Sequence, residues 1–224
     1  MNLKGKVVFI TGSSIGIGRE DAFAFAKEGS RIVITYYKDK KEGEEVAKKC
    51  LELSAEDALV VQLNVMDNKS IKDAVKKVVD KFSKISILVN NAGVIYWKPL
   101  KNQSLEEIEN QVRTNLEGLI KMTKIALPHI KDMIINIASG AGMHGYEDLS
   151  VYGATKWAVR GFTKSLSEEL SKIKVYVVNP GMTKTRMTGF IGIEAEKVAR
   201  VILNLAKGEY NLPSGSDVNI WDYV

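Results

Sequence analysis

Short apolar runs alternate along the chain with longer stretches in which apolar and polar positions recur at helical spacing. The short runs are rich in Val and Ile and continuously apolar, which is typical of strands that are covered on both faces. They predict seven strands, at Val7–Thr11, Arg31–Tyr36, Ala58–Val65, Ile85–Asn90, Asp132–Ser139, Lys174–Asn179 and Asp217–Trp221. The amphipathic stretches predict helices at Gly18–Glu28, Lys41–Leu53, Ser70–Phe82, Leu105–His129, Tyr152–Leu170 and Glu194–Ala206.

This alternation of strands and helices indicates an α/β fold of the Rossmann type. It predicts a doubly wound parallel sheet of about seven strands with helices on both faces. No Gly-, Ser- or Pro-rich linker and no internal repeat interrupts the pattern, so we expect one domain over residues 1–224. In such a sheet, ligands bind beyond the carboxyl ends of the strands, where the strand order reverses. The loops that follow the strands are therefore where chemistry is expected.

Composition narrows the possible classes of protein. Cys50 is the only cysteine and there are two histidines, so neither an internal disulfide nor a metal site is expected. The N-terminus lacks an adequate signal-peptide core, and no apolar stretch reaches the length of a membrane span. We therefore expect a cytoplasmic protein without membrane contact. The net charge is +5, but the lysines are scattered among acidic residues, which argues against nucleic-acid binding.

The first candidate site is the glycine-rich loop Thr11–Gly18, T-G-x-x-x-G-x-G, between the first strand and the first helix. Glycines there let the backbone approach a diphosphate, which backbone N–H groups and the helix dipole then stabilise. Glu20 and Asp21 are expected in the first turns of that helix, where acidic side chains complement the dipole. We interpret these two residues as structural.

The same loop also fits a serine hydrolase motif. Residues 12–16 read G-x-S-x-G, the nucleophile elbow of that class, which likewise lies between a strand and a helix. Such an enzyme needs a histidine late in the chain, but the only two are His129 and His144. We therefore reject the hydrolase interpretation.

Three further loops or helices carry candidate residues that are weak signals individually. The segment 90–93, N-N-A-G, follows the fourth strand, and Ser139 precedes Gly140, both of which are common turn chemistry. Tyr152 and Lys156 are spaced i, i+4, which places them on one helix face. A nearby ammonium is expected to lower the pKa of the phenol, which would suit general acid–base chemistry. The apolar face of that helix is expected at positions 151, 154, 158, 161, 162 and 165.

Taken in order, these motifs resemble those of the short-chain dehydrogenase/reductase family. They comprise the glycine loop, N-N-A-G at 90–93, Asn115, Ser139, Y-x-x-x-K at 152–156, and Pro180-Gly181 with Thr185, and they span most of the chain. The layout is similar to that of 3-oxoacyl-[acyl-carrier-protein] reductases. The resemblance implies an oxidoreductase in which Tyr152 protonates a substrate carbonyl and Ser139 hydrogen-bonds it. Lys156 would bind the nicotinamide ribose, and Asn115 would hold a water that links Lys156 to solvent.

The resemblance also implies which residues bind a dinucleotide cofactor. These are Gly12, Ser13, Ser14, Gly16, Ile17, Gly18, Thr35, Tyr36, Lys38, Asn64, Val65, Asn91, Ala92, Gly93, Tyr152, Lys156, Pro180, Gly181, Thr183 and Thr185. An NAD enzyme of this fold carries an acidic residue at the end of the second strand, where this chain has Tyr36. NADP(H) is therefore the preferred cofactor, with Lys38 near its 2′-phosphate, although Ile15 leaves one usual basic position empty. NAD(H) remains the alternative.

The sequence predicts the substrate and the oligomeric state only in general terms. The substrate is expected to be a small carbonyl compound or alcohol, with an acyl thioester as one candidate. The segment after Thr185 is short, which predicts an open pocket. Two long helices with apolar stripes predict a homotetramer or homodimer. A dinucleotide-sensing protein without catalysis is the alternative function, and the intact set Asn115, Ser139, Tyr152 and Lys156 argues against it.

Overall fold

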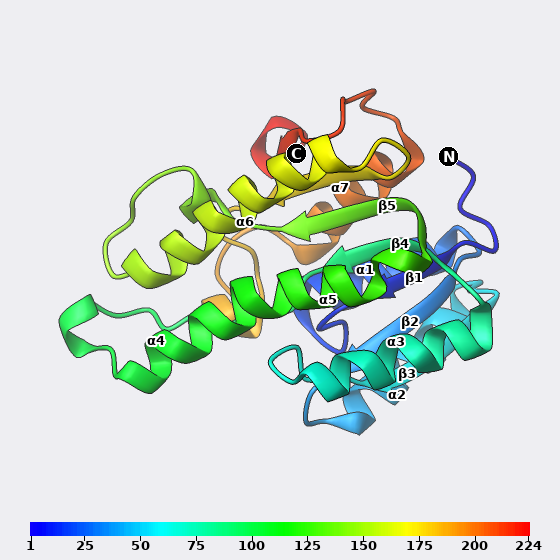
Figure 1. Ribbon diagram of the computed structural model, residues 1–224, viewed down its shortest axis with the longest axis horizontal. Helices are drawn as coiled ribbons and strands as arrows, with labels where there is room; N and C mark the ends of the chain where they lie inside the picture. The colour runs from blue at the N-terminus through cyan, green and yellow to red at the C-terminus, as the bar shows by residue number, and fades with distance from the viewer.

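Seven parallel strands form one sheet, and the computed structural model describes all residues 1–224. Their order across the sheet is β3-β2-β1-β4-β5-β6-β7, which confirms the doubly wound α/β fold expected from the sequence (Figure 1). The strands are β1 (Val7–Ile10), β2 (Arg31–Tyr36), β3 (Asp57–Gln62), β4 (Ile85–Asn90), β5 (Ile130–Ile137), β6 (Lys174–Asn179) and β7 (Asp217–Asn219). The order reverses between β1 and β4, so that crevice is where a ligand is expected.

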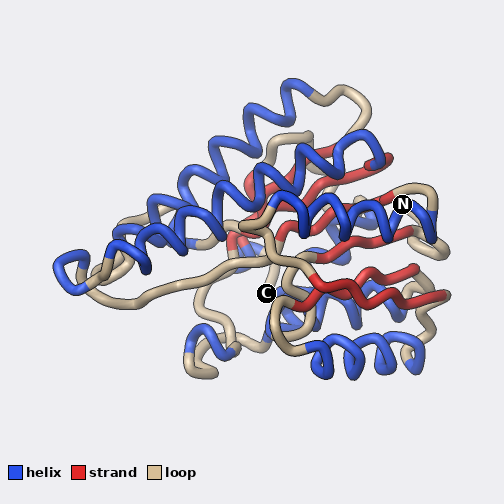
Figure 2. The backbone as a smooth tube through the Cα atoms, turned by 60° about the horizontal axis from the view of Figure 1, so that its bottom comes forward, coloured by secondary structure: helices blue, strands red, loops and turns tan.

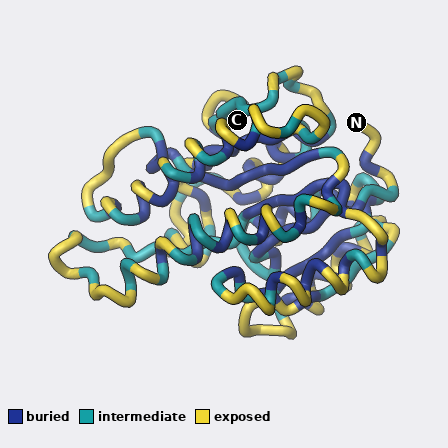
Figure 3. Tube along the Cα trace, in the orientation of Figure 1, coloured by how far each residue is buried: buried dark blue, intermediate teal, exposed yellow.

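Helices cover both faces of the sheet (Figure 2). On one face lie α1 (Gly16–Lys27), α2 (Lys40–Glu52) and α7 (Ala195–Lys207), which share one hydrophobic cluster. On the other face lie α3 (Asn68–Phe82), α5 (Leu119–Ala126) and α6 (Ser150–Glu169), which contribute to a second cluster. The short helix α4 (Leu105–Val112) extends α5 away from the sheet. Every residue of β1 and β4 is buried, as their largely apolar sequences predict (Figure 3).

Several strands end earlier than the apolar runs suggest. The β3 strand stops at Gln62, opposite Tyr36, the last residue of its only neighbour β2. The predicted extension to Val65 is wrong because Asn64 and Val65 have no strand left to pair with. The last strand likewise ends at Asn219, opposite Asn179 at the end of β6. A strand on an edge of the sheet is thus limited by its partner and not by its own hydrophobicity.

The expected helix over 105–129 is one continuous helical run with an internal irregularity. It contains α4, a π-helical turn over Arg113–Gly118, α5 and a final 3₁₀ turn, Leu127–His129. π-helical turns inside α-helices occur frequently at functional sites. Asn115 lies in this turn and is buried.

The predicted buried face of α6 is wrong. Its buried residues are Tyr152, Gly153, Thr155, Lys156, Val159, Thr163 and Leu166. Ala154, Gly161 and Ser165, which were expected in the core, are exposed. The buried face combines polar residues, among them Tyr152 and Lys156 of the site, with the apolar Val159 and Leu166.

Helix α1 begins at Gly16, two residues before the predicted start. Asp21 therefore lies in its second turn and does not complement the helix dipole, so that expectation is wrong. The side chain is fully buried, and neither carboxylate oxygen has a hydrogen-bond partner. Burial raises the pKa of Asp21 well above its ordinary value, and the nearby Glu20 adds to the shift.

The helices are also informative about membranes. None of them combines the length and the apolar character that crossing a bilayer requires.

Candidate active site

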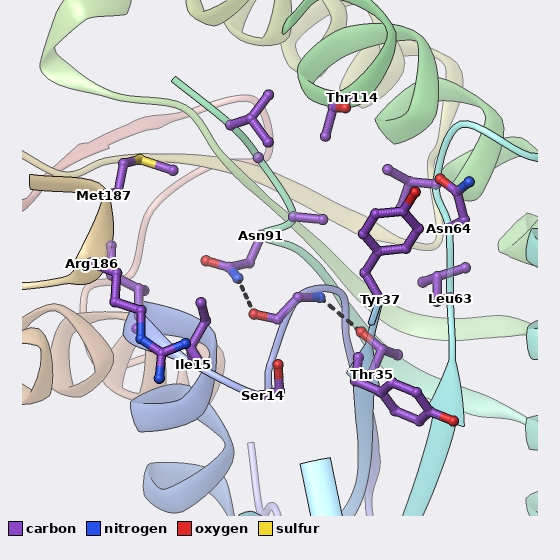
Figure 4. A pocket seen from close by; sticks show the side chains of 18 of the residues that line it. Ser14, Ile15, Thr35, Tyr37, Leu63, Asn64, Asn91, Thr114, Arg186 and Met187 are labelled. Carbon is purple, nitrogen blue, oxygen red and sulfur yellow. Dashed lines mark hydrogen bonds between the residues drawn. The ribbon is translucent and has the colours of Figure 1, made fainter. Parts of the chain in front are cut away.

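Two adjoining cavities lie at the carboxyl ends of the strands. The first, of about 360 Å³, runs from the glycine loop to the ends of β2, β3 and β4. The second, of about 270 Å³, contains Ser139, Tyr152 and Lys156. Ile17, Asn91, Gly93, Thr185 and Met187 line both, so the two cavities form one continuous cleft. Figure 4 shows the first cavity, with Ser14, Ile15 and Arg186 on one side and Tyr37 and Asn64 on the other.

The glycine loop is fastened to the end of β2. The Gly12 N–H donates to Thr35 Oγ1 at 2.8 Å (Figure 4), and this hydroxyl donates to Ile10 O at 3.0 Å. Ser13 is fully buried, where its Oγ donates to Ile10 O and accepts from the Thr35 N–H. Both hydroxyls are therefore engaged within the protein and fix the loop in place.

A second set of hydrogen bonds ties the glycine loop to the end of β4. The Asn91 side-chain amide donates to Thr11 O at 2.9 Å and Gly12 O at 3.0 Å. Gly18 packs closely beneath this contact, since a Cβ atom there would lie 2.5 Å from Asn91 Nδ2 and 2.6 Å from Gly12 O. Gly18 is thus required by close packing, while Gly12 and Gly16 adopt positive φ angles that favour glycine.

The chemical groups of the second cavity come from β5 and α6. The Lys156 ammonium donates to Ile137 O at 2.9 Å and lies 5.6 Å from the centroid of the Tyr152 ring. Ser139 follows β5, and its hydroxyl accepts from the Ala141 N–H at 3.1 Å. Tyr152 and Lys156 are both buried. The i, i+4 spacing thus brings a phenol and an ammonium into one desolvated space beside a hydroxyl.

Burial controls the protonation of both groups. It raises the pKa of Tyr152 to about 12, although a hydrogen bond with Ser139 acts in the opposite direction. The expected lowering by Lys156 is therefore wrong for this structure, because desolvation of the phenolate dominates. Burial also lowers the pKa of Lys156 to about 8. The phenol is consequently a proton donor through the neutral range.

Asn115 supports the loop after β4. Its Oδ1 accepts from the Val94 N–H at 2.8 Å, and its Nδ2 donates to Val94 O at 2.9 Å and to Thr155 Oγ1 at 3.2 Å. The side chain therefore clamps this loop to α6 one residue before Lys156. Both N–H groups of its amide are used, and its Oδ1 accepts one hydrogen bond, so the side chain acts mainly as a structural link.

Most of the residues predicted to bind a cofactor line the continuous cleft. The exceptions are Ser13 and Gly18, which support the loop from beneath, and Lys38. The Lys38 ammonium lies 5.4 Å from the centroid of the Tyr37 ring. Lys40 and Lys41 form ion pairs with Glu44 and Glu45 on the surface of α2.

Sequence reasoning missed several residues that line the cleft. Those in the first cavity include Tyr37, Met66, Asn110, Thr114 and Arg186, and those in the second include Ile95, Trp97, Tyr146, Leu149 and Met182. Tyr37 follows Tyr36 directly, so its position after β2 was a usable signal. The others come from loops or helix faces whose approach to the site depends on the fold.

The first cavity fits a dinucleotide. It begins at the glycine loop, where positive φ angles at Gly12 and Gly16 turn the backbone ahead of the N-terminus of α1. A helix N-terminus reached through such a loop favours a diphosphate. No cluster of three or more His, Cys, Asp or Glu side chains suited to a metal ion is present.

Comparison with known proteins agrees with this geometry. The family described as short chain dehydrogenase matches residues 6–195. An uncharacterized oxidoreductase of Bacillus subtilis is 40% identical over 184 residues, which cover 80% of this chain and 63% of that protein. A 3-oxoacyl-[acyl-carrier-protein] reductase of Thermotoga maritima is 32% identical, with 98% of each chain covered.

Solved structures lead to the same family. A short chain dehydrogenase of Burkholderia cenocepacia in complex with NADP superposes with a TM-score of 0.91 at 26% identity, covering 98% of this chain and 97% of the other. A 3-ketoacyl-(acyl-carrier-protein) reductase of Brucella melitensis complexed with NADH gives 0.89 at 29% identity, covering 97% of both. The chain belongs to the short-chain dehydrogenase family, as its ordered motifs predicted.

Proposed function

We propose that this oxidoreductase interconverts a ketone and a secondary alcohol, with NADP(H) as its preferred cofactor and Tyr152 as general acid and base. The observation that carries the proposal is that the buried Tyr152 and Lys156 meet Ser139 in a cavity that is continuous with the one at the glycine loop. When bound, the dinucleotide would donate the hydride during reduction and accept it during oxidation. A relative of known name, the Thermotoga reductase, makes a 3-oxoacyl thioester one candidate substrate.

The residues of the chain divide the remaining tasks. The Tyr152 phenol gives its proton to the carbonyl oxygen during reduction and takes it back during oxidation. The Ser139 hydroxyl donates a hydrogen bond that orients the same oxygen. Lys156 binds the nicotinamide ribose and supplies positive charge close to the phenol. Asn115 holds the loop around Gly93 in position through its hydrogen bonds with Val94.

The walls of the second cavity favour an uncharged substrate. Ile95, Trp97, Leu149 and Met182 provide apolar surface, and Lys156 is the only charged side chain that lines the cavity. A carboxylate or phosphate on the substrate would lose its hydration there without gaining a partner, apart from the lysine that the cofactor engages. The substituents of the carbonyl are therefore apolar or at most weakly polar.

A substrate panel tests the function. Reduced cofactor absorbance should fall with aliphatic and aromatic ketones, and 2-oxo acids of the same size should be reduced at least about tenfold less efficiently. Including 3-oxoacyl thioesters and the corresponding alcohols tests that candidate and the direction. Tight cofactor binding without turnover of any compound would contradict the proposal and favour a dinucleotide sensor.

We also propose that the protein forms a homodimer or homotetramer through the outer face of α6. The outer face of α6 and the adjoining α4 enclose an apolar hollow of about 340 Å³, lined by Leu100, Val112, Leu116, Val151 and Ala154 among others. Leu105 and Trp157 are largely exposed on the same two helices. Apolar surface of this kind marks interaction sites, and closed symmetric pairing buries it on both subunits.

Light scattering measures the assembly directly. We expect a mass of two or four times 24.8 kDa at micromolar concentration, and Trp157→Glu should shift the mass toward that of a single chain. The matched variant Trp221→Glu changes an exposed tryptophan near the C-terminus and should leave the mass unaltered. A single-chain mass for the unmodified protein would refute the assembly.

A further inference from the structure

The selectivity for a 2′-phosphate has no evident source in the residues that the sequence singles out. The second strand ends in Tyr36 and Tyr37 without a carboxylate, which permits NADP but does not attract it. Ile15 is apolar. The lysines that follow β2 do not line the cleft, as described above for Lys38, Lys40 and Lys41.

One charged residue does line the first cavity. Among its 21 lining residues, Arg186 is the only one with a charged side chain. It comes from the loop after β6, far along the chain, and lies beside Ile15 and Ser14 (Figure 4). The same three residues also line a shallower hollow that extends to Glu42 at the start of α2. The arginine thus stands where the glycine loop itself offers no cation.

The backbone of Arg186 lies in a hydrogen-bonded turn, and its side chain, which is 63% exposed, forms one ion pair. Its backbone lies in a short 3₁₀ turn, Arg186–Thr188, in which the Thr188 hydroxyl donates to Thr183 O at 2.5 Å. Its guanidinium lies 2.6 Å from Glu42 Oε1. Glu42 is in the first turn of α2, the helix that follows β2. The ion pair therefore joins the loop after β6 to the start of α2, the helix that follows the strand end where an adenosine ribose is expected.

We propose that Arg186 is the residue that selects NADP(H) over NAD(H), by binding the 2′-phosphate, and that the Glu42 carboxylate, which pairs with the same guanidinium, weakens that binding. The proposal rests on the function proposed above and names its cofactor determinant. A guanidinium binds phosphate oxygens through paired N–H donors, which suits Arg better than Lys at such a place. The pair with Glu42 carries no net charge, so loss of either partner changes the local charge in opposite directions.

Equilibrium binding distinguishes this role from others. NADPH and NADH are titrated into the full-length protein by calorimetry, with 2′,5′-ADP and 5′-AMP as fragments that differ by the 2′-phosphate. Arg186→Ala should weaken NADPH and 2′,5′-ADP by about 10–100-fold, the range of a charge-assisted hydrogen bond. NADH and 5′-AMP should change by less than about threefold. Arg186→Lys should recover part of the NADPH affinity.

Two further variants, at Glu42 and at Lys184, test the role of the ion pair and provide a control for the loss of positive charge. Glu42→Gln should tighten NADPH by about 2–5-fold without affecting NADH, because it leaves Arg186 uncompensated. Lys184→Ala removes the same charge two residues away, from a side chain paired with Glu194 and outside the cleft, and should change neither. Thermal unfolding of each variant verifies that it is folded.

The outcomes separate the two proposals. Binding of neither dinucleotide by the unmodified protein would overturn the proposed function itself. Tight binding of both, with Arg186→Ala weakening NADPH and NADH equally, would overturn only the present inference and assign Arg186 to the shared diphosphate. A loss of NADPH affinity in Glu42→Gln, or an equal loss in Lys184→Ala, would also overturn it.

Discussion

Replacing Tyr152 by Phe should lower kcat by about 10²–10⁴-fold while leaving cofactor affinity within about twofold. The substitution removes one hydroxyl from a buried ring and keeps the packing of that ring. Because burial raises the pKa of Tyr152 to about 12, the wild-type phenol carries its proton throughout the neutral range. Ser139 and Lys156 remain in the variant, so the loss reports the proton transfer alone. Stopped-flow and steady-state measurements with the best ketone of the panel give kcat, and calorimetry gives cofactor affinity.

The control for this variant lies in the same cavity. Tyr146→Phe removes the same hydroxyl from a residue that lines the cavity but is 54% exposed. It should change kcat by less than about threefold, since an exposed phenol has no fixed position from which to transfer a proton. Near-normal turnover in Tyr152→Phe would remove Tyr152 from the mechanism.

The second large effect concerns stability and comes from Asp21. In the unfolded chain this carboxyl loses its proton near pH 4. In the folded chain burial raises its pKa, so between the two pKa values the folded protein binds more protons than the unfolded one. The free energy of unfolding must therefore fall as pH rises from about 4 toward the folded pKa. The buried carboxyl therefore lowers the free energy of unfolding at pH 7. It has little effect on this free energy in acid, where it is protonated in both states.

Asp21→Asn isolates this contribution because Asn has the same shape and does not titrate. The variant and the wild type should have similar stability near pH 4. Above pH 4, the free energy of unfolding of the variant should exceed that of the wild type by about 1.4 kcal/mol more for each pH unit. This difference should stop growing at the folded pKa of Asp21. Urea unfolding at several pH values measures the difference. The matched control is Asp80→Asn, which changes an exposed residue of α3. If the free energy of unfolding had the same pH dependence in the wild type and in Asp21→Asn, the account would be contradicted.

Much of the architecture was predictable because its signals are local. Three strands, β2, β4 and β6, have the bounds that their apolar runs predict. The glycine loop lies between a strand and a helix that are adjacent in sequence. Tyr152 and Lys156 lie close together because four residues make about one helical turn. Each of these features depends on neighbours in sequence, so the chain specifies it without reference to the rest of the fold.

The remaining features depend on partners that are distant in sequence. The end of β3 was set by the length of β2, and the buried face of α6 by the site against which it packs. Small residues at 154, 161 and 165 fit either a core or a surface, so helical periodicity could not choose between them. Nor could it show that α1 begins early enough to bury Asp21 completely.

The sequence by itself determined the type and order of the elements, the family, and the positions of the catalytic candidates. Tertiary structure alone decided that burial raises the pKa of Tyr152, and that Lys38, Lys40 and Lys41 do not line the cleft. It also brought Arg186 beside Ile15, across more than 160 residues of chain. Periodicity reports which residues share a strand or helix face, whereas burial and long-range contacts arise only when separate elements pack together.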